Sequence, residues 1–303
     1  MSELEDYKTV LIVGNGFDRN IGMKTAYSEF MESELFKDII SKGENTFLKY
    51  LESKNRNYER WVDIEIELGK YASMLNSQLK ISDLGKEIID TKRPSDVQNE
   101  FKNDYIKLCN VLKEYLNIEN SKIPDKMMTK SSIAYKLIKD MLQDRTPFCV
   151  INFNYTKFVE SIVKCLNDTY VDYCIRYIHG SLDSKSDIVF GVQDSLILKR
   201  EHVFLYKSYS KYKNVRGLPL IFEKANKIIF FGYSLGETDH SYFDDFFRAQ
   251  TQPNCKEKEF IFYHYGSDAY DDIIWNLKLL TNNRTAYLNQ YNKLTFIDSS
   301  KTK

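Results

Sequence analysis

The sequence predicts an α/β protein built on a parallel β-sheet that is covered by helices on both faces. Three features of the chain support this prediction. Short and almost uninterrupted apolar runs recur along it, as in strands that are buried on both sides. Segments with the apolar spacing of helices separate these runs, and glycine-rich turns follow two of them. Alternation of buried strands with helices is typical of parallel sheets, because the crossover helices cover both faces.

Six segments have the composition of buried strands. The first, Lys8 to Val13, leads directly into Gly14-Asn15-Gly16, where the absence of a Cβ atom lets the backbone turn sharply. The others are Phe148 to Phe153, Cys174 to Ile178, Ile228 to Phe231, Glu259 to His264 and Leu294 to Ile297. Helical spacing follows the second strand at residues 158–166 and the fourth strand at residues 242–247. This order predicts a Rossmann-like fold.

Between about Phe30 and Thr146 helical spacing replaces the strand signal, and we therefore predict a large helical insertion after the first βα unit. Residues 1–30 and 147–303 would form the Rossmann-like core, and residues 31–146 the insertion. The stretch from Trp61 to Leu68 alternates like a half-buried strand, but its apolar stripe continues with helical spacing to Leu75. Its length and its surroundings favour a helix.

Composition and charge exclude several classes of protein. Lysine plus arginine and aspartate plus glutamate number 43 each, so the net charge of zero argues against a uniformly basic nucleic-acid coat or a polybasic membrane anchor. The first residues lack the pattern of a secretory signal. The longest uncharged run, residues 146–156, is too short and too polar to cross a bilayer. We therefore expect a soluble, cytoplasmic protein that makes no membrane contact.

The cysteines and histidines predict neither disulfides nor a metal. The 5 cysteines are an odd number without C-x-x-C spacing, which indicates no disulfide framework and no structural zinc module. The 4 histidines and the scattered carboxylates show no H-E-x-x-H or comparable spacing. We therefore expect no metal site.

The turn Gly14-Asn15-Gly16-Phe17 lies at the carboxyl end of the first strand, where an open parallel sheet usually binds its ligand. Backbone N–H groups and the start of the following helix would face an anionic group there. A dinucleotide fingerprint G-x-G-x-x-G would need a third glycine where Arg19 stands. A tight turn that needs glycine for steric reasons is therefore an equal alternative.

A second glycine turn, Gly232 to Gly236, follows the fourth strand and precedes Asp239. Two such turns at separate strand ends would hold the two ends of one dinucleotide, and Asp239 suits either a first helical turn or a ligand contact. The turn also matches the G-x-S-x-G nucleophile elbow around Ser234, with residues 239–264 able to supply an acid and a histidine. That hydrolase alternative leaves the first glycine turn without a role.

Polar side chains end two further strands. Asn152 and Asn154 close the second strand, where buried amides are costly unless they are hydrogen-bonded. Helix capping is one explanation; we interpret Asn152 as structural and Asn154 as functional. The third strand ends in His179-Gly180, and a histidine there suits a general base near neutral pH as well as a buried structural residue. Because it shares its sheet edge with the other polar strand ends, we favour function for His179.

The segment from Lys199 to Lys227 is locally basic, and aromatic residues are interleaved with its lysines and arginines. Such a segment can bind single-stranded nucleic acid through phosphate contacts and stacking. Its apolar residues nevertheless keep helical spacing, as in Leu198, His202, Leu205, Tyr209 and Tyr212. We therefore expect a core-facing stripe beside a solvated lysine face, and nucleic-acid binding only as a weaker alternative.

Taken in order, four motifs of the chain resemble the bacteriophage abortive-infection AbiH family. They are VLIVGNGFD at residues 10–18, FNYT at 153–156, IHG at 178–180, and FGYSLGETD at 231–239 with Tyr242-Phe243. The stretches from Gly22 to Phe30 and from Trp61 to Glu65 also look like that family. The resemblance spans most of the chain and implies a phage-defence protein.

The same motifs are more distantly similar to bacterial sirtuin-like domains, which bind NAD. This similarity implies that Asn154 orients the nicotinamide ribose and that His179 acts on a ribose hydroxyl or a water molecule. It implies cofactor contacts for Gly14, Asn15, Gly16, Phe17, Asp18, Gly180, Gly232, Ser234 and Asp239. Thr156 stands where those domains often have aspartate, and the four-cysteine zinc module of sirtuin deacylases is absent from the sequence. Protein deacylation is therefore not expected.

These resemblances lead to an expected function. The chain would be an abortive-infection effector that binds NAD and hydrolyses its nicotinamide–ribose bond after infection. A nucleotide-binding sensor or scaffold without catalysis is the alternative, and a nucleic-acid-acting enzyme is a weaker one. Expected partners are NAD or a related nucleotide, a phage-derived trigger or defence protein, and a second copy of the chain.

Overall fold

The computed structural model describes residues 7–42, 46–57, 63–76, 94–122, 130–166, 171–183, 187–210 and 215–301. Its centre is a six-stranded, fully parallel sheet with the strand order β3-β2-β1-β4-β5-β6. The strands are β1 Thr9–Val13, β2 Phe148–Asn152, β3 Tyr173–Tyr177, β4 Lys227–Phe231, β5 Glu259–His264 and β6 Lys293–Asp298. All six predicted strands are confirmed. The order reverses between β1 and β4, the point at which doubly wound sheets bind ligands.

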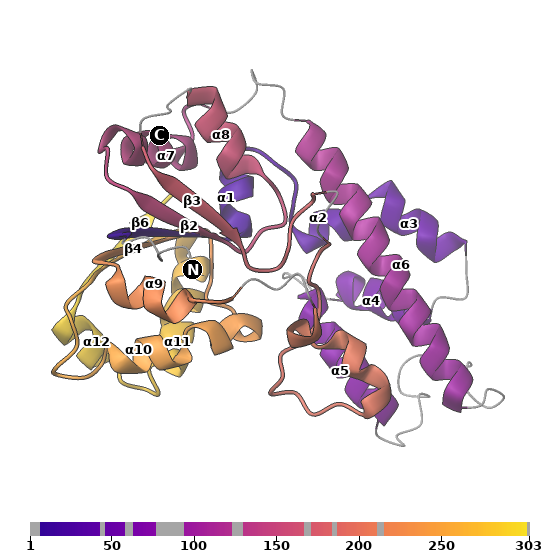
Figure 1. Ribbon diagram of the computed structural model, residues 1–303. Coiled ribbons are helices and arrows are strands. Elements are labelled where there is room, and N and C mark those ends of the chain that lie inside the picture. Colours follow the sequence, from indigo (N-terminus) through magenta and orange to yellow (C-terminus); the bar gives the residue numbers. More distant parts are fainter. Residues whose placement is uncertain are drawn as a thin grey trace.

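Helices cover both faces of the sheet, as predicted (Figure 1). Successive residues of a strand point to opposite faces, so Val10 and Ile12 pack on one side and Leu11 and Val13 on the other. The first side is covered by α9 Leu218–Lys224, α10 Asp244–Ala249, α11 Gly266–Leu280 and α12 Thr285–Tyr291. The second side is covered by α1 Asn15–Asn20, α7 Ile133–Gln143 and α8 Phe158–Leu166. Burial on both faces explains the uninterrupted apolar sequences of β1, β2 and β4.

A separate helical layer stands beside the sheet (Figure 1). It consists of α2 Tyr27–Met31, α3 Glu34–Ser41, α4 Thr46–Asn57, α5 Ile64–Asn76 and α6 Pro94–Ser121, which share their own hydrophobic core. Ile64 and Leu68 are buried whereas Ile66 is 41% exposed, as a helix requires and an alternating strand does not. Trp61 lies outside the described residues. The predicted insertion is thus helical, and its last helix, α7, covers the sheet rather than joining this layer.

The crossover from β3 to β4 connects the two parts. It carries His179, two short 3₁₀ helices, η2 Arg200–Leu205 and η3 Lys207–Tyr209, and then α9. Leu205 is buried in the core of the helical layer, but Tyr209 is 69% exposed, so the predicted continuous core-facing stripe is wrong there. A 3₁₀ helix has three residues per turn, which breaks the i, i+4 spacing between these positions. Tyr212 lies outside the described residues.

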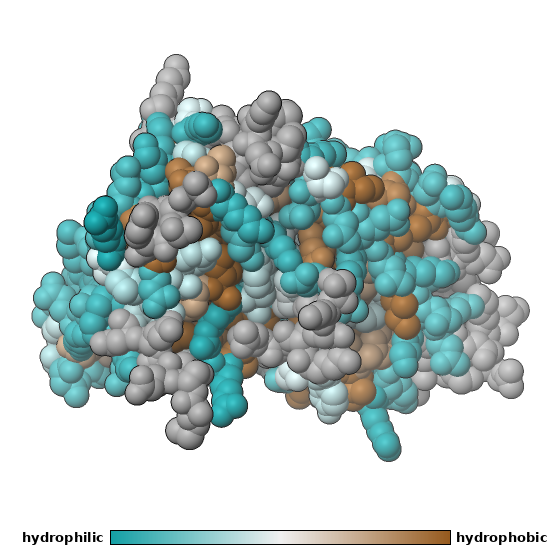
Figure 2. Space-filling model, turned by 45° about the horizontal axis from the view of Figure 1, so that its top comes forward, coloured by the Kyte–Doolittle hydropathy of each residue, from teal (hydrophilic) through white to brown (hydrophobic). Residues whose placement is uncertain are grey.

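Polar residues dominate the face of the molecule drawn in Figure 2, and hydrophobic residues come to its surface only in narrow strips. Within the described part of the chain, none of the helices combines the length and the apolar character that a bilayer crossing demands.

The glycine turns after β1 and β4 are in direct contact. The N–H group of Gly16 donates to the carbonyl oxygen of Gly232 at 2.9 Å. A Cβ atom on Gly232 would lie 2.3 Å from the Cα atom of Gly16, and the φ angle of Gly232 is +59°. Both the close approach and the left-handed backbone require glycine at position 232. The steric explanation considered for the first glycine turn is therefore correct, and it applies to both turns.

Three alanine substitutions separate these two requirements. Gly236→Ala, at an ordinary φ of −55° and with its nearest neighbour atom 3.7 Å away, should change the free energy of unfolding by less than about 0.5 kcal/mol. Gly266→Ala has a left-handed φ of +73° but open space, and should lose about 1–2 kcal/mol. Gly232→Ala meets both penalties and should lose more than about 3 kcal/mol or fail to fold. Chemical denaturation of the three variants measures this order, and equal losses for Gly232→Ala and Gly266→Ala would contradict the contact.

Candidate functional site

A cavity of about 170 Å³ lies at the carboxyl ends of the strands, at the switch point between β1 and β4. Most of the residues that the sequence singled out line it: Gly14, Asn15, Asp18, Asn154, His179, Gly232, Ser234 and Asp239. Tyr27 and Glu65 from the helical layer close it on the side away from the sheet. Four motifs that are far apart in the sequence therefore converge on one site.

A second cavity, of about 540 Å³, adjoins the first. Gly16, Arg19, His264 and Tyr265 are among its lining residues. The two cavities share Asn15, Gly232, Tyr233 and Ser234, so the contacting glycine turns lie between them. Two of the predicted contacts line neither cavity, namely Phe17, which is fully buried in the hydrophobic core, and Gly180. Gly16 lines only the second cavity.

The end of β2 holds a buried carboxyl group in place. The Nδ2 atom of Asn154 donates to Asp18 Oδ1 at 2.8 Å and to the carbonyl oxygen of Gly14 at 2.9 Å, and Thr156 Oγ1 donates to Asp18 Oδ2 at 2.7 Å. Asn152 is used locally, because its Oδ1 accepts from the Asn154 N–H group and its Nδ2 donates to the Thr156 carbonyl oxygen. Asn152 thus shapes the turn that aims Asn154, in agreement with the structural interpretation of Asn152.

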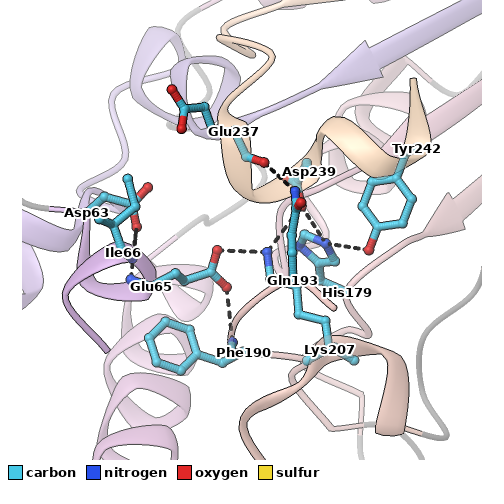
Figure 3. Close-up of polar contacts among 12 residues, drawn as sticks. Asp63, Glu65, Ile66, His179, Phe190, Gln193, Lys207, Glu237, Asp239 and Tyr242 are labelled. Atoms are coloured by element: carbon cyan, nitrogen blue, oxygen red, sulfur yellow. Dashed lines mark hydrogen bonds and ion pairs between the residues drawn. The ribbon is translucent and has the colours of Figure 1, made fainter. Parts of the chain in front are cut away.

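His179 belongs to a buried polar network (Figure 3). Its Nε2 atom lies 3.2 Å from Asp239 Oδ1 and 3.4 Å from the hydroxyl oxygen of Tyr242. Tyr233 donates to the other oxygen of Asp239 at 3.1 Å. Because a carboxylate can only accept, a neutral His179 carries its hydrogen on Nε2 and has its basic lone pair on Nδ1. Asp239 therefore fixes both the orientation and the tautomer of the ring.

Lys207 connects this network to the helical layer (Figure 3). Its Nζ atom lies 3.1 Å from Asp239 Oδ1 and 2.7 Å from Glu65 Oε2, and the Lys207 side chain is only 2% exposed. Glu65 Oε1 accepts from the Gly191 N–H group at 3.2 Å. Asp63 caps the start of α5 by accepting from the N–H groups of Glu65 and Ile66, which fixes the position of Glu65.

The charges of this network depend on one another. Burial by itself would lower the pKa of Lys207, but Asp239 and Glu65 outweigh it and raise that pKa, so the ammonium stays charged. Burial would raise the pKa of Asp239, but Lys207 and His179 hold it well below its usual range. Burial raises the pKa of Glu65 to about 7, because the attraction of Lys207 offsets only part of the burial cost. Asp239 is thus the firmly ionised partner of His179.

Lys207 and Glu65 are the residues of this site that sequence reasoning missed. Lys207 was expected on a solvated lysine face, and its burial corrects that expectation. The sequence does contain an indication of a buried cation: in α5, Glu65 lies between Ile64 and Leu68 on the buried side of an amphipathic helix. A carboxylate in that position needs a buried cation from elsewhere in the chain. The burial of Lys207 also removes one of the cations on which the nucleic-acid alternative relied.

The geometry does not assemble the hydrolase triad considered for Ser234. Asp239 is paired with His179 and Lys207, and His264 Nδ1 meets the carbonyl oxygen of Gly266 at 2.9 Å. The left-handed φ angle of a nucleophile elbow falls on Leu235, at 57°, rather than on Ser234. Across the described residues, no cluster of three or more His, Cys, Asp and Glu side chains is placed to bind a metal ion.

Fold and site define a Rossmann-type α/β protein with a buried histidine–carboxylate pair at its switch point. The family model of bacteriophage abortive infection AbiH proteins matches residues 10–263, so the chain belongs to that family. The matched range runs from β1 into β5 and includes every residue that lines the first cavity. No curated protein matches the chain.

Loss of the buried cation should be far more damaging than loss of a surface one. Lys207→Met leaves Glu65 and Asp239 without their shared partner and should lower the free energy of unfolding by about 3–5 kcal/mol. Lys37→Met removes the exposed pair with Glu34, which spans 2.9 Å, and should cost at most about 1 kcal/mol. Urea denaturation compares the two. Adding Glu65→Gln to Lys207→Met should restore part of the loss, and equal effects of the two lysine variants would contradict the network.

Proposed function

We propose that this protein is an abortive-infection effector that binds NAD across the two adjoining cavities and hydrolyses its nicotinamide–ribose bond. The observation that carries the proposal is the convergence of Asn154 and the oriented His179 in a cavity at the switch point of the sheet. Family membership supports the role in defence against bacteriophage.

The two cavities suit a ligand made of two halves. The shared residues Asn15, Gly232 and Ser234 would lie beside the diphosphate, as expected of a dinucleotide at a switch point. The nicotinamide riboside would occupy the first cavity, with Asn154 and His179. The adenosine would occupy the larger one, where Tyr263 and Tyr265 offer aromatic surface.

The N–H groups of the first glycine turn contribute less than the sequence predicted. Gly14 donates to the Phe231 carbonyl oxygen, Gly16 to Gly232, and Phe17 to Gly14, at 2.9–3.1 Å. These donors are used within the protein, so a diphosphate would be held by others. Arg19, which is exposed and lines the second cavity, is the nearest candidate for charge-assisted contacts to phosphate.

The proposed reaction is a displacement by water. The bond between C1′ of the ribose and the nicotinamide nitrogen breaks, and its electron pair neutralises the pyridinium ring. A water oxygen bonds to C1′ and loses a proton, which His179 accepts on the ring nitrogen that does not face Asp239. The products are ADP-ribose, nicotinamide and a proton. Asp239 acts as a positioning residue, because it holds the ring and stabilises the imidazolium that forms, and Lys207 holds Asp239 in place.

The test is cellular NAD during phage challenge, because an abortive-infection effector acts after its trigger. Wild-type cells should lose NAD as they resist the phage. His179→Ala should lower the hydrolysis rate by about 10²- to 10⁴-fold and abolish both NAD loss and protection. His240→Ala is the matched control, since His240 contacts the Leu235 carbonyl oxygen at 2.9 Å and does not line the first cavity. It should keep both properties.

Melting temperatures of the purified variants distinguish catalysis from structure. A merely structural His179 would leave buried partners unsatisfied when truncated, at about 1–3 kcal/mol, and would lower stability and protection together. A positioned base would lose activity while the protein stays folded. Full protection by His179→Ala at normal expression, or unchanged NAD in protected wild-type cells, would overturn the proposed reaction.

One observation favours the alternative of a nucleotide-binding sensor without turnover. Both hydrogens of Asn154 Nδ2 are engaged within the protein, by Gly14 and Asp18, so only its Oδ1 atom is left to act on a ribose. Mass spectrometry of protein purified from infected cells separates the two functions. Intact NAD or another nucleotide retained over time supports the sensor, whereas accumulating ADP-ribose and nicotinamide supports the enzyme.

A further inference from the structure

We propose that Asp18 makes the first cavity selective for the cationic form of its ligand, so that oxidised NAD, with its pyridinium ring, is bound in preference to the neutral dihydropyridine of reduced NAD. This inference rests on the proposed function, and it adds which redox form the site takes.

Asp18 is a buried carboxyl group whose neighbours are neutral donors. It is 2% exposed, yet it lines the first cavity. Its two oxygens accept from Asn154 at 2.8 Å and from Thr156 at 2.7 Å. Within the described ranges, no lysine, arginine or histidine forms an ion pair with it. Of the other carboxyl groups that line this cavity, Asp239 and Glu65 share the ammonium of Lys207, and Asp63 accepts from the N–H groups of Glu65 and Ile66 at the start of α5. Among the described residues, no cationic side chain pairs with this cavity carboxyl group, so a ligand can supply the opposite charge.

Burial raises the pKa of Asp18 to about 7, and the hydrogen bonds from Thr156, Asn154 and Thr25 offset only part of that cost. The group is thus largely protonated at pH 6 and largely ionised at pH 8. A cationic ring binds the ionised form better, so the affinity for a cation should rise as the pH rises through 7. A neutral ring gains nothing from this ionisation.

The other titratable and charged groups around Asp18 come from several elements. Arg19 follows it on α1, and Tyr177 on β3 interacts with it electrostatically. The remaining groups line the same cavity or belong to its network, namely the carboxyl groups of Asp63, Glu65 and Asp239, the phenol groups of Tyr27, Tyr155 and Tyr233, the imidazole of His179 and the ammonium of Lys207. Burial raises the pKa of Asp63 as well. Lys207 stays charged and Asp239 stays ionised through pH 6–8, whereas Glu65, with a pKa of about 7, titrates with Asp18. The Asp18 variant therefore has to separate the two carboxyl groups.

The experiment is isothermal titration of the full chain with carbocyclic NAD, whose bond to nicotinamide is not labile, in its oxidised and reduced forms. At pH 8 the wild type should bind the oxidised form about 10- to 100-fold more tightly. At pH 6 this preference should shrink by about tenfold, as the fraction of ionised Asp18 falls. Asp18→Asn mimics the protonated side chain and should bind both forms with similar affinity at both pH values.

Two further variants keep the proposal testable. Asp104→Asn changes another buried carboxyl group, which accepts from the Phe47 N–H group in the helical layer, and should leave the preference unchanged. Thr156→Val removes a hydrogen bond from Asp18 but keeps its carboxyl group. It should move the midpoint of the pH dependence upward while the preference persists at high pH. Thermal melts confirm that each variant is folded.

Each outcome has one meaning. If neither form binds to wild type at any pH, the proposed function fails. If both forms bind with equal affinity at pH 6 and pH 8, NAD binding stands and the role of Asp18 is overturned. If Asp18→Asn keeps the preference, another carboxyl group is responsible and the inference also fails. If Asp18→Asn does not fold, Thr156→Val decides, because an unmoved midpoint contradicts titration of Asp18.

Discussion

The site depends on the ion pairs that the ammonium group of Lys207 forms. The ammonium group is shared by two buried carboxyl groups that come from different parts of the fold, Glu65 from the helical layer and Asp239 from the segment after β4. Lys207 itself lies on the crossover between β3 and β4. A single charge thus joins three segments that are distant in the sequence, and burial makes each partner indispensable to the others. Through Asp239 the same charge governs the orientation of His179.

Because of this arrangement, the helical layer contributes residues to the site itself. Tyr27, Glu65, Leu112 and Leu116 line the first cavity, so α2, α5 and α6 form the wall that faces the strand ends. A displacement of α5 would move Glu65 away from Lys207 and release the constraint on Asp239. The connection between layer and sheet is therefore polar and strongly coupled.

Much of the fold could be predicted from the sequence, because burial on both faces gives each strand an apolar run and because crossover helices have a different period. The convergence of Asn154 and His179 also followed from their strand-end positions. The ion network could not be predicted in this way. Lys207 lies in a basic segment whose 3₁₀ geometry breaks the helical period, and its partner Glu65 is 142 residues away. The contact of Gly16 with Gly232 could not be predicted either. It depends on the pairing of β1 with β4, and the order of strands in a sheet does not follow from the local sequence of each strand.

The distribution of charged residues in the two cavities bears on how the proposed ligand would be oriented. The first cavity is lined by the carboxyl groups of Asp18, Glu65 and Asp239, and Lys207 compensates the latter two. A phosphate group there would meet like charge in a poorly solvated site, which is strongly unfavourable. The second cavity is larger, and the guanidinium of Arg19 lines it together with the carboxyl groups of Glu32, Asp268 and Asp272. In the proposed binding mode, the cationic end of the dinucleotide would therefore lie among the carboxyl groups of the first cavity, and Arg19 is the arginine that can face the diphosphate from the second cavity.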